Sequence, residues 1–122
     1  MESRFNELCS KHFFDGLLFA SVTDRDGVVV LKCKSDNAKE DLMEPILSTT
    51  FAVTNNQASK LGLGNNKSII SVYDLYQIIQ FIDTPFIINI IADASSNTGL
   101  FINLGNNLLE LTKPLVESMI EK

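Results

Sequence analysis

Apolar side chains recur every three or four positions in three parts of the chain, a spacing that predicts helices. The first dozen residues form the shortest of these helices, and its apolar side carries Phe5, Leu8 and Cys9. The second begins near Pro45, which suits a first helical turn, and ends at Gly62, a natural C-terminal cap. One face of this second helix consists of Leu47, Phe51, Thr54, Ala58 and Leu61. The last helical stripe runs over Leu100, Leu104, Leu108, Leu111, Leu115 and Met119.

Five short runs have the alternating or continuously apolar character of β-strands, at residues 17–23, 28–34, 68–73, 76–81 and 86–92. Alternation in the second run places Lys32 and Lys34 on the face opposite Val29, Leu31 and Cys33. The linkers 74–75 and 82–85 are too short to contain a crossover helix, so the last three strands should be antiparallel. The final strands are apolar at odd and even positions alike, which predicts a sheet covered on both faces.

The predicted order is helix, strand, strand, helix, three strands, helix, in one α+β domain over residues 1–122. Its length of 122 residues suits a single domain with its own hydrophobic core. Gly105 and Pro114 interrupt the helical propensity of the last element, so a kink or a break is expected there.

Charge and composition narrow the range of partners. The chain has a net charge of −5 and no cluster of Lys or Arg, so we expect neither nucleic acid nor a bare anionic membrane as a partner. The longest apolar stretch, Phe86–Ala92, is far too short to span a bilayer, and residues 1–5 do not begin a signal peptide. We therefore expect no direct insertion into a membrane. Cys9 and Cys33 are too far apart for a CxxC motif and are expected to be reduced thiols.

Three motifs suggest a binding or catalytic site, but each is explained better by an ordinary structural role. Residues 62–68, Gly-Leu-Gly-Asn-Asn-Lys-Ser, resemble part of a phosphate loop, but a helix enters the segment, a strand leaves it, and the glycine spacing is wrong. Residues 24–27, Asp-Arg-Asp-Gly, lack the further ligands of a calcium loop and favour a hairpin turn. His12 is the only histidine and has no partner for a zinc site, so we expect it on the surface at a helix end. We therefore predict no catalytic, metal or cofactor site and no enzymatic activity.

Two further segments stand out. The first has a simple structural explanation, and the second does not. The loop 94–99 is expected to provide an N-cap for the last helix, either Asn97 or Thr98. The run Ser68–Tyr73 carries no charge, and at the edge of a sheet it would be an unprotected site for pairing with another strand.

Several collinear strings resemble the roadblock/LC7 family, and within it the MEK-partner subunits of the Ragulator complex. They extend over the chain from about Phe5 onward, and the match is looser at residues 82–84 and 105–107. The strings lie at residues 24–27, 47–49, 59–63, 66–70, 76–77, 80–81 and 97–100.

The resemblance implies a fold of α/β/α layers. A five-stranded antiparallel sheet would carry the central helix on one face and the two terminal helices on the other. It implies a non-catalytic scaffold that pairs with a second roadblock subunit as a heterodimer. The implied interface combines the central helix with the strand that follows it: Thr50, Val53, Thr54, Gln57, Ser68, Ile69, Ile70, Ser71, Val72 and Tyr73.

The resemblance further implies that a lipidated Ragulator adaptor subunit holds the pair on the cytoplasmic face of late endosomes and lysosomes. There it would help to dock Rag GTPases for mTOR activation and bring MEK and ERK together in MAPK signalling. An alternative is a different roadblock role, such as a dynein cargo adaptor or a regulator of a small GTPase.

Overall fold

The structure, a computed structural model, describes residues 2–24, 28–36, 38, 67–83 and 86–120. The central helix predicted between Pro45 and Gly62 lies outside these residues. The described elements are α1 (Glu2–Ser10), β1 (Leu17–Asp24), β2 (Val29–Lys34), β3 (Lys67–Val72), β4 (Tyr76–Asp83), β5 (Phe86–Asp93) and α3 (Thr98–Ile120).

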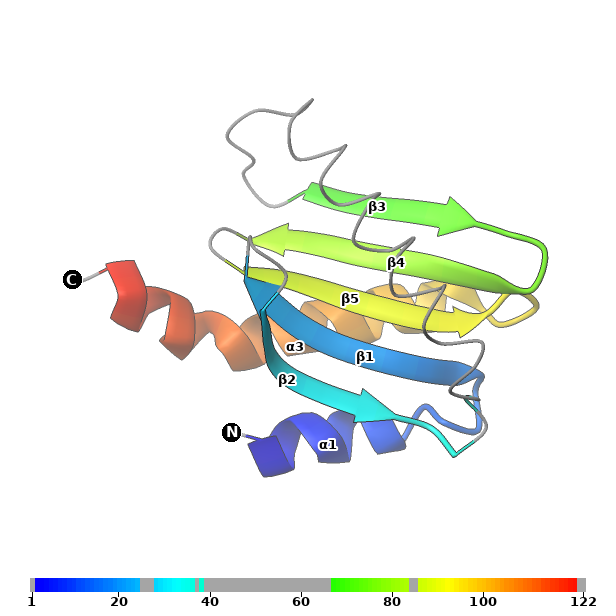
Figure 1. Ribbon diagram of the computed structural model, residues 1–122, viewed down its shortest axis with the longest axis horizontal. Coiled ribbons are helices and arrows are strands. Elements are labelled where there is room, and N and C mark those ends of the chain that lie inside the picture. Colours follow the sequence, from blue (N-terminus) through cyan, green and yellow to red (C-terminus); the bar gives the residue numbers. More distant parts are fainter. Residues whose placement is uncertain (1, 25–27, 37, 39–66, 84–85, 121–122) are drawn as a thin grey trace.

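The strands form one five-stranded sheet in the order β2-β1-β5-β4-β3, and every pairing is antiparallel (Figure 1). The pairing of β1 with β5, in the middle of the sheet, joins the N-terminal pair β1–β2 to the three later strands β3–β5. Its register sets Val22 opposite Ile88 and Ala20 opposite Ile90. The last three strands are therefore antiparallel, as their short linkers predicted.

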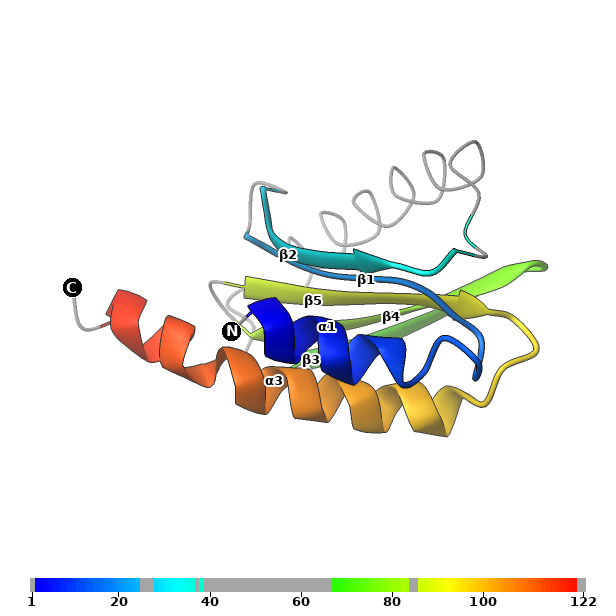
Figure 2. The same ribbon diagram turned by 90° about the horizontal axis from the view of Figure 1, so that it is seen from below.

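Helices α1 and α3 lie on the same face of the sheet (Figure 2). Between them and the sheet, Phe5 of α1 and Phe101 and Leu104 of α3 are fully buried against Ile88 and Ile90 of β5. Burial of large apolar side chains of this kind is the main favourable contribution to folding, at about 2–3 kcal/mol for each one. The shared face of the two terminal helices is the arrangement that the family resemblance implied.

The opposite face of the sheet is also buried, and it contains a polar row. Phe19, Ile78 and Ile91 form an apolar cluster there. In the row beside them, Gln80 Nε2 donates to Asn89 Oδ1 at 2.9 Å, and Asn89 Nδ2 lies 3.3 Å from Ser21 Oγ. Because both faces of β5 are buried, the prediction of a sheet covered on both sides is confirmed for this strand.

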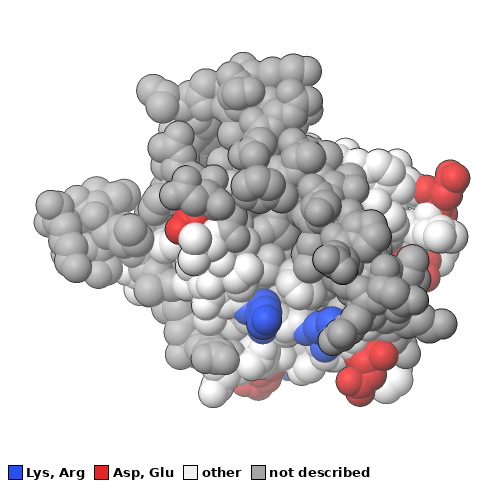
Figure 3. Space-filling view, in the orientation of Figure 1, with Lys and Arg blue, Asp and Glu red and all other residues white. Residues whose placement is uncertain are grey.

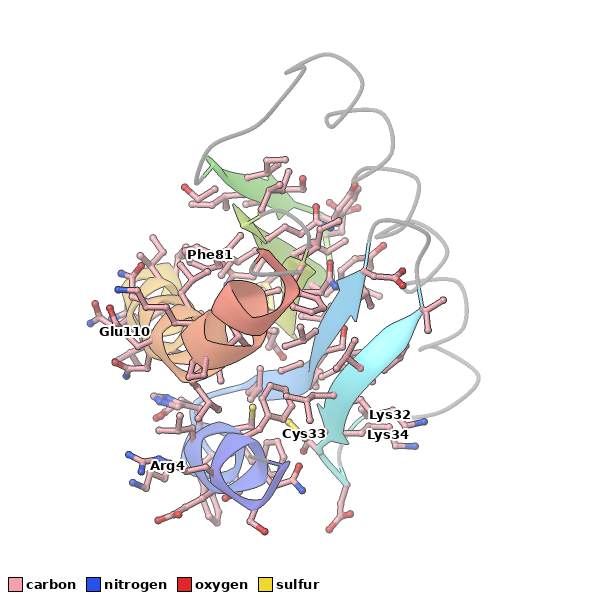
Figure 4. The ribbon with its side chains drawn as sticks, turned by 90° about the vertical axis from the view of Figure 1, so that its left-hand side faces the viewer. Arg4, Lys32, Cys33, Lys34, Phe81 and Glu110 are labelled. Atoms are coloured by element: carbon pink, nitrogen blue, oxygen red, sulfur yellow. The ribbon has the colours of Figure 1, made fainter. Side chains whose placement is uncertain are left out.

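The last helix is unbroken, so of the expected kink or break the break does not occur. Helix α3 runs from Thr98 to Ile120 with Pro114 inside it. Its start is capped by Asn97, whose Oδ1 accepts a hydrogen bond from Gly99 N at 2.9 Å, so of the two candidate caps Asn97 is the one that the structure uses. Gly105 lies inside the helix, where its missing side chain leaves room for the ring of Phe81, which points from β4 toward α3 (Figure 4).

Candidate functional site

Strand β3 forms one edge of the sheet. Among the described strands it pairs with β4 alone, in a register that sets Ile70 opposite Ile79 and Val72 opposite Gln77. In an edge strand, the backbone N–H and C=O groups that point outward are available to a further strand. This edge strand contains most of the uncharged run Ser68–Tyr73, which was singled out from the sequence as a pairing site if it lay at a sheet edge.

The register also fixes which side chains of β3 face which way. Directly paired residues share a face, so Ile70 and Val72 lie on the face covered by α1 and α3, together with Ile79. Ile69 and Ser71 lie on the other face, opposite Gln80 and Ile78.

Although they share a face with α3, the apolar residues of β3 remain accessible. Ile70 is 46% exposed and Val72 is 68% exposed, while Ser68 is exposed and Ile69 and Ser71 are half-buried. Helix α3 packs on β4 and β5, one and two strands further in, and leaves the edge uncovered. An apolar strip beside an open strand edge is what a partner strand would bury.

The turn after β3 carries a further exposed apolar side chain and is held by local contacts. Tyr73 N donates to Tyr76 O at 2.9 Å, and the two tyrosine rings stack with centroids 4.9 Å apart. Between them Leu75 is 73% exposed, while its carbonyl accepts a hydrogen bond from Ala94 N at 3.3 Å. Leu75 was not singled out from the sequence, although an apolar residue in a two-residue turn is a signal for an exposed apolar side chain.

The two edges of the sheet differ in charge. On the opposite edge, Lys32 and Lys34 project from β2 on the side away from α1 and α3 (Figure 4), and basic side chains lie over the lower part of that face (Figure 3). Leu31 and Cys33 point the other way, as the alternation predicted. Charged residues on an edge strand discourage pairing with another strand, so β3 is the better suited of the two edges for a partner.

A buried glutamine ties β4 to the start of α3. Gln77 is 1% exposed, and its Nε2 donates to the carbonyls of Asp93 and Ser96 at 3.0 and 3.1 Å. Its Oε1 accepts a 2.6 Å hydrogen bond from Thr98 Oγ1. Gln77 therefore holds the β5–α3 connection against the same end of the sheet at which the β3–β4 turn lies.

An aspartate in this connection is held in its charged form. Asp93 Oδ1 accepts hydrogen bonds from Ser95 N at 2.9 Å and from Ser95 Oγ at 2.8 Å. These two bonds hold the pKa of the exposed Asp93 carboxyl below its ordinary value.

Only part of the predicted interface can be placed. Thr50, Val53, Thr54 and Gln57 lie outside the described residues. The others follow one another along one edge: Ser68, Ile69, Ile70, Ser71 and Val72 in β3, and Tyr73 directly after it.

The motifs considered for chemistry have structural positions where they are described. Residues 62–66 lie outside the described residues, while Lys67 begins β3, as expected for a strand leaving that segment. Asp24 ends β1 and accepts a 2.9 Å hydrogen bond from Val28 N, in keeping with a hairpin. His12 differs from its expected surface position: it is half-buried, with its ring 6.2 Å from that of Phe101 and Nδ1 3.2 Å from Asp15 Oδ2.

Within the described part of the chain, no three His, Cys, Asp or Glu side chains are grouped so that they could hold a metal ion. None of the described helices is long and apolar enough to cross a membrane.

Comparison with known proteins gives close relatives over most of the chain. Residues 2–120 match the family model described as mitogen-activated protein kinase kinase 1 interacting. The Ragulator complex protein LAMTOR3 of Homo sapiens is 46% identical over 101 residues, which cover 83% of this chain and 82% of the human one. LAMTOR3-A of Xenopus laevis is 43% identical over 106 residues, which cover 87% and 86% of the two chains.

Solved structures agree on the fold. MglB in a tetrameric arrangement matches with a TM-score of 0.69 at 15% identity, covering 96% of this chain and 90% of MglB. A roadblock/LC7 domain from Streptomyces avermitilis matches with a TM-score of 0.65 at 14% identity, covering 92% and 97%. The fold is therefore that of the roadblock/LC7 domains, and the chain belongs to the mitogen-activated protein kinase kinase 1 interacting family.

Proposed function

We propose that this chain is a non-catalytic adaptor subunit that pairs with a second roadblock subunit across the outer edge of β3. The observation that carries the proposal is the edge itself: the uncharged run Ser68–Tyr73, in which Ile70 and Val72 are exposed. Pairing would extend the sheet into the partner, satisfy the outward backbone groups of β3 and bury this apolar strip. Thr50, Val53, Thr54 and Gln57 of the central segment would complete the contact.

The assembly that we propose is of the Ragulator type. The support comes from the family match and from relatives that carry the name Ragulator complex protein LAMTOR3. In this assembly the chain would bring MEK and ERK together and would help to dock Rag GTPases. A lipidated adaptor subunit would hold the assembly on the cytoplasmic face of late endosomes and lysosomes, because the chain itself would not insert into the membrane.

The proposal rests on surfaces rather than on a reactive site. A scaffold requires exposed contact residues such as Ile70, Val72 and Leu75, whereas a catalyst requires convergent ionisable groups in a pocket. This is why family membership and the free edge together favour an adaptor.

Purification of the tagged chain from its own cells, followed by identification of the bound chains, tests the proposal. We expect a second roadblock subunit and the other Ragulator-type subunits in stoichiometric amounts. Recovery of dynein chains, or of a small GTPase without other Ragulator-type subunits, would favour the alternative roadblock roles.

A further inference from the structure

The two cysteines of the chain, distant in sequence, both lie where α1 packs against β2. Cys9 lies in the last turn of α1 and is fully buried in the hydrophobic cluster beneath the helices. Cys33 of β2 is half-buried and packs against the same cluster. Figure 4 shows Cys33 on the side of β2 opposite Lys32 and Lys34, which is the side that faces α1.

The two thiols are in hydrogen-bonding contact and are chemically unequal. The thiol of Cys9 donates to the sulfur of Cys33, and this bond, with burial as the second cause, raises the pKa of Cys9 far above its ordinary value. The same bond lowers the pKa of Cys33, and a hydrogen bond from the backbone of Ala20 acts in the same direction. Cys33 is therefore both the more accessible sulfur and the one more readily present as a thiolate.

We propose that Cys9 and Cys33 form a thiol-oxidation site, in which a peroxide oxidises Cys33 and Cys9 then closes an intramolecular disulfide between α1 and β2. The proposal stands on the packing of α1 against β2, on the position of both side chains in the cluster between them, and on the partial exposure of Cys33.

The chemistry balances with hydrogen peroxide as the oxidant. The Cys33 thiolate attacks one peroxide oxygen, the O–O bond breaks, and Cys33 becomes a sulfenic acid while hydroxide leaves. The sulfur of Cys9 then attacks the sulfur of Cys33, the S–O bond breaks, and the proton of Cys9 leaves with the oxygen as water. Two thiols have lost two electrons to the peroxide, and a small thiol such as glutathione can return them by exchange.

The expected consequence is a firmer attachment of α1. This helix has only nine residues, and a helix this short depends on its packing for stability. A disulfide from Cys9 to Cys33 would join it covalently to the sheet and would also close a loop in the unfolded chain, which disfavours unfolding.

The test measures how strongly the fold itself promotes the disulfide. The full-length chain is equilibrated with glutathione redox buffers, once folded and once in urea, and the effective concentration of one thiol at the other is obtained from each. We expect a value roughly 100-fold higher in the folded chain. The ratio of the two values equals the factor by which the disulfide raises the folding equilibrium constant. An effective concentration that is no higher when the chain is folded would overturn the proposal.

Two variants test the assigned order of events. In Cys9→Ser, peroxide should produce a sulfenic acid at Cys33 that persists and can be labelled with dimedone, because the second thiol is gone. In Cys33→Ser, Cys9 should remain unlabelled. Labelling of Cys9 as fast as that of Cys33 would contradict the roles. If the buried Cys9 substitution prevents folding, the glutathione measurement on the unaltered chain still decides.

Discussion

Gly105 of α3 lies directly against the ring of Phe81 in β4, and a Cβ atom built on Gly105 would overlap three atoms of that ring. Glycine costs a helix interior about 1 kcal/mol relative to alanine, so its presence here needs a compensating gain. The gain is the close approach of α3 to the sheet, since a larger residue at position 105 would displace either the helix or the ring.

Gly105→Ala should therefore destabilise the fold by about 1–3 kcal/mol, because overpacking outweighs the improved helix propensity. Asn106→Ala is the matched control: Asn106 is exposed on the same turn, so its replacement should be neutral or slightly stabilising. Urea unfolding of both variants measures the difference. If both alanines stabilise the chain by similar amounts, the close contact with Phe81 does not constrain the helix.

Gln77→Leu should cost about 2–4 kcal/mol of folding stability. The substitution removes the bonds from Gln77 to the carbonyls of Asp93 and Ser96 and to the hydroxyl of Thr98, although the Asp93 carbonyl keeps a bond from Ser96 N. Thr98→Val removes only one of these bonds and should cost about 1 kcal/mol. Thermal unfolding that shows equal losses for the two variants would mean that the bonds to the carbonyls contribute little.

The NMR titration of the Asp93 carboxyl tests the local electrostatics. Its pKa in the folded chain should lie below the ordinary value of 3.8, and Ser95→Ala should move it part of the way back by removing the hydroxyl donor. A lowered folded pKa stabilises the fold above the ordinary pKa, and this contribution is lost as the pH falls through the folded pKa. Because Asp93 is exposed, the effect on overall stability should be small. An unchanged pKa in Ser95→Ala would contradict the assigned role of the hydroxyl.

Local pattern was enough to predict every described strand to within two residues at either end. For example, the run predicted at 86–92 corresponds to β5 (Phe86–Asp93). Turn residues and a strict period of two or of three to four positions carry this information locally. The close packing at Gly105 could not be predicted, because it involves Phe81, a residue from a strand distant in the sequence.

The sequence alone also could not predict which side chains of β3 face the helices. Alternation separates Ile70 and Val72 from Ile69 and Ser71, but it does not say which pair faces the helices, because that depends on the register with β4 and on the packing of the whole sheet. The pairing of Ile70 with Ile79 supplies the missing information and places Ile70 and Val72 on the α3 side. A substitution at Ile70 can therefore be designed to reach the exposed strip directly.

The affinity for the second roadblock subunit, measured for Ile70→Lys and Val30→Lys, tests the central claim. Ile70 and Val30 are 46% and 43% exposed on the two opposite edge strands, so either lysine should change the stability of the chain by less than about 1 kcal/mol. At a β3 interface, however, the lysine of Ile70→Lys would lose water or block contact, so the affinity should fall at least roughly 10-fold, while Val30→Lys binds normally. Normal binding by a folded Ile70→Lys variant, or an equal loss in Val30→Lys, would contradict pairing through β3.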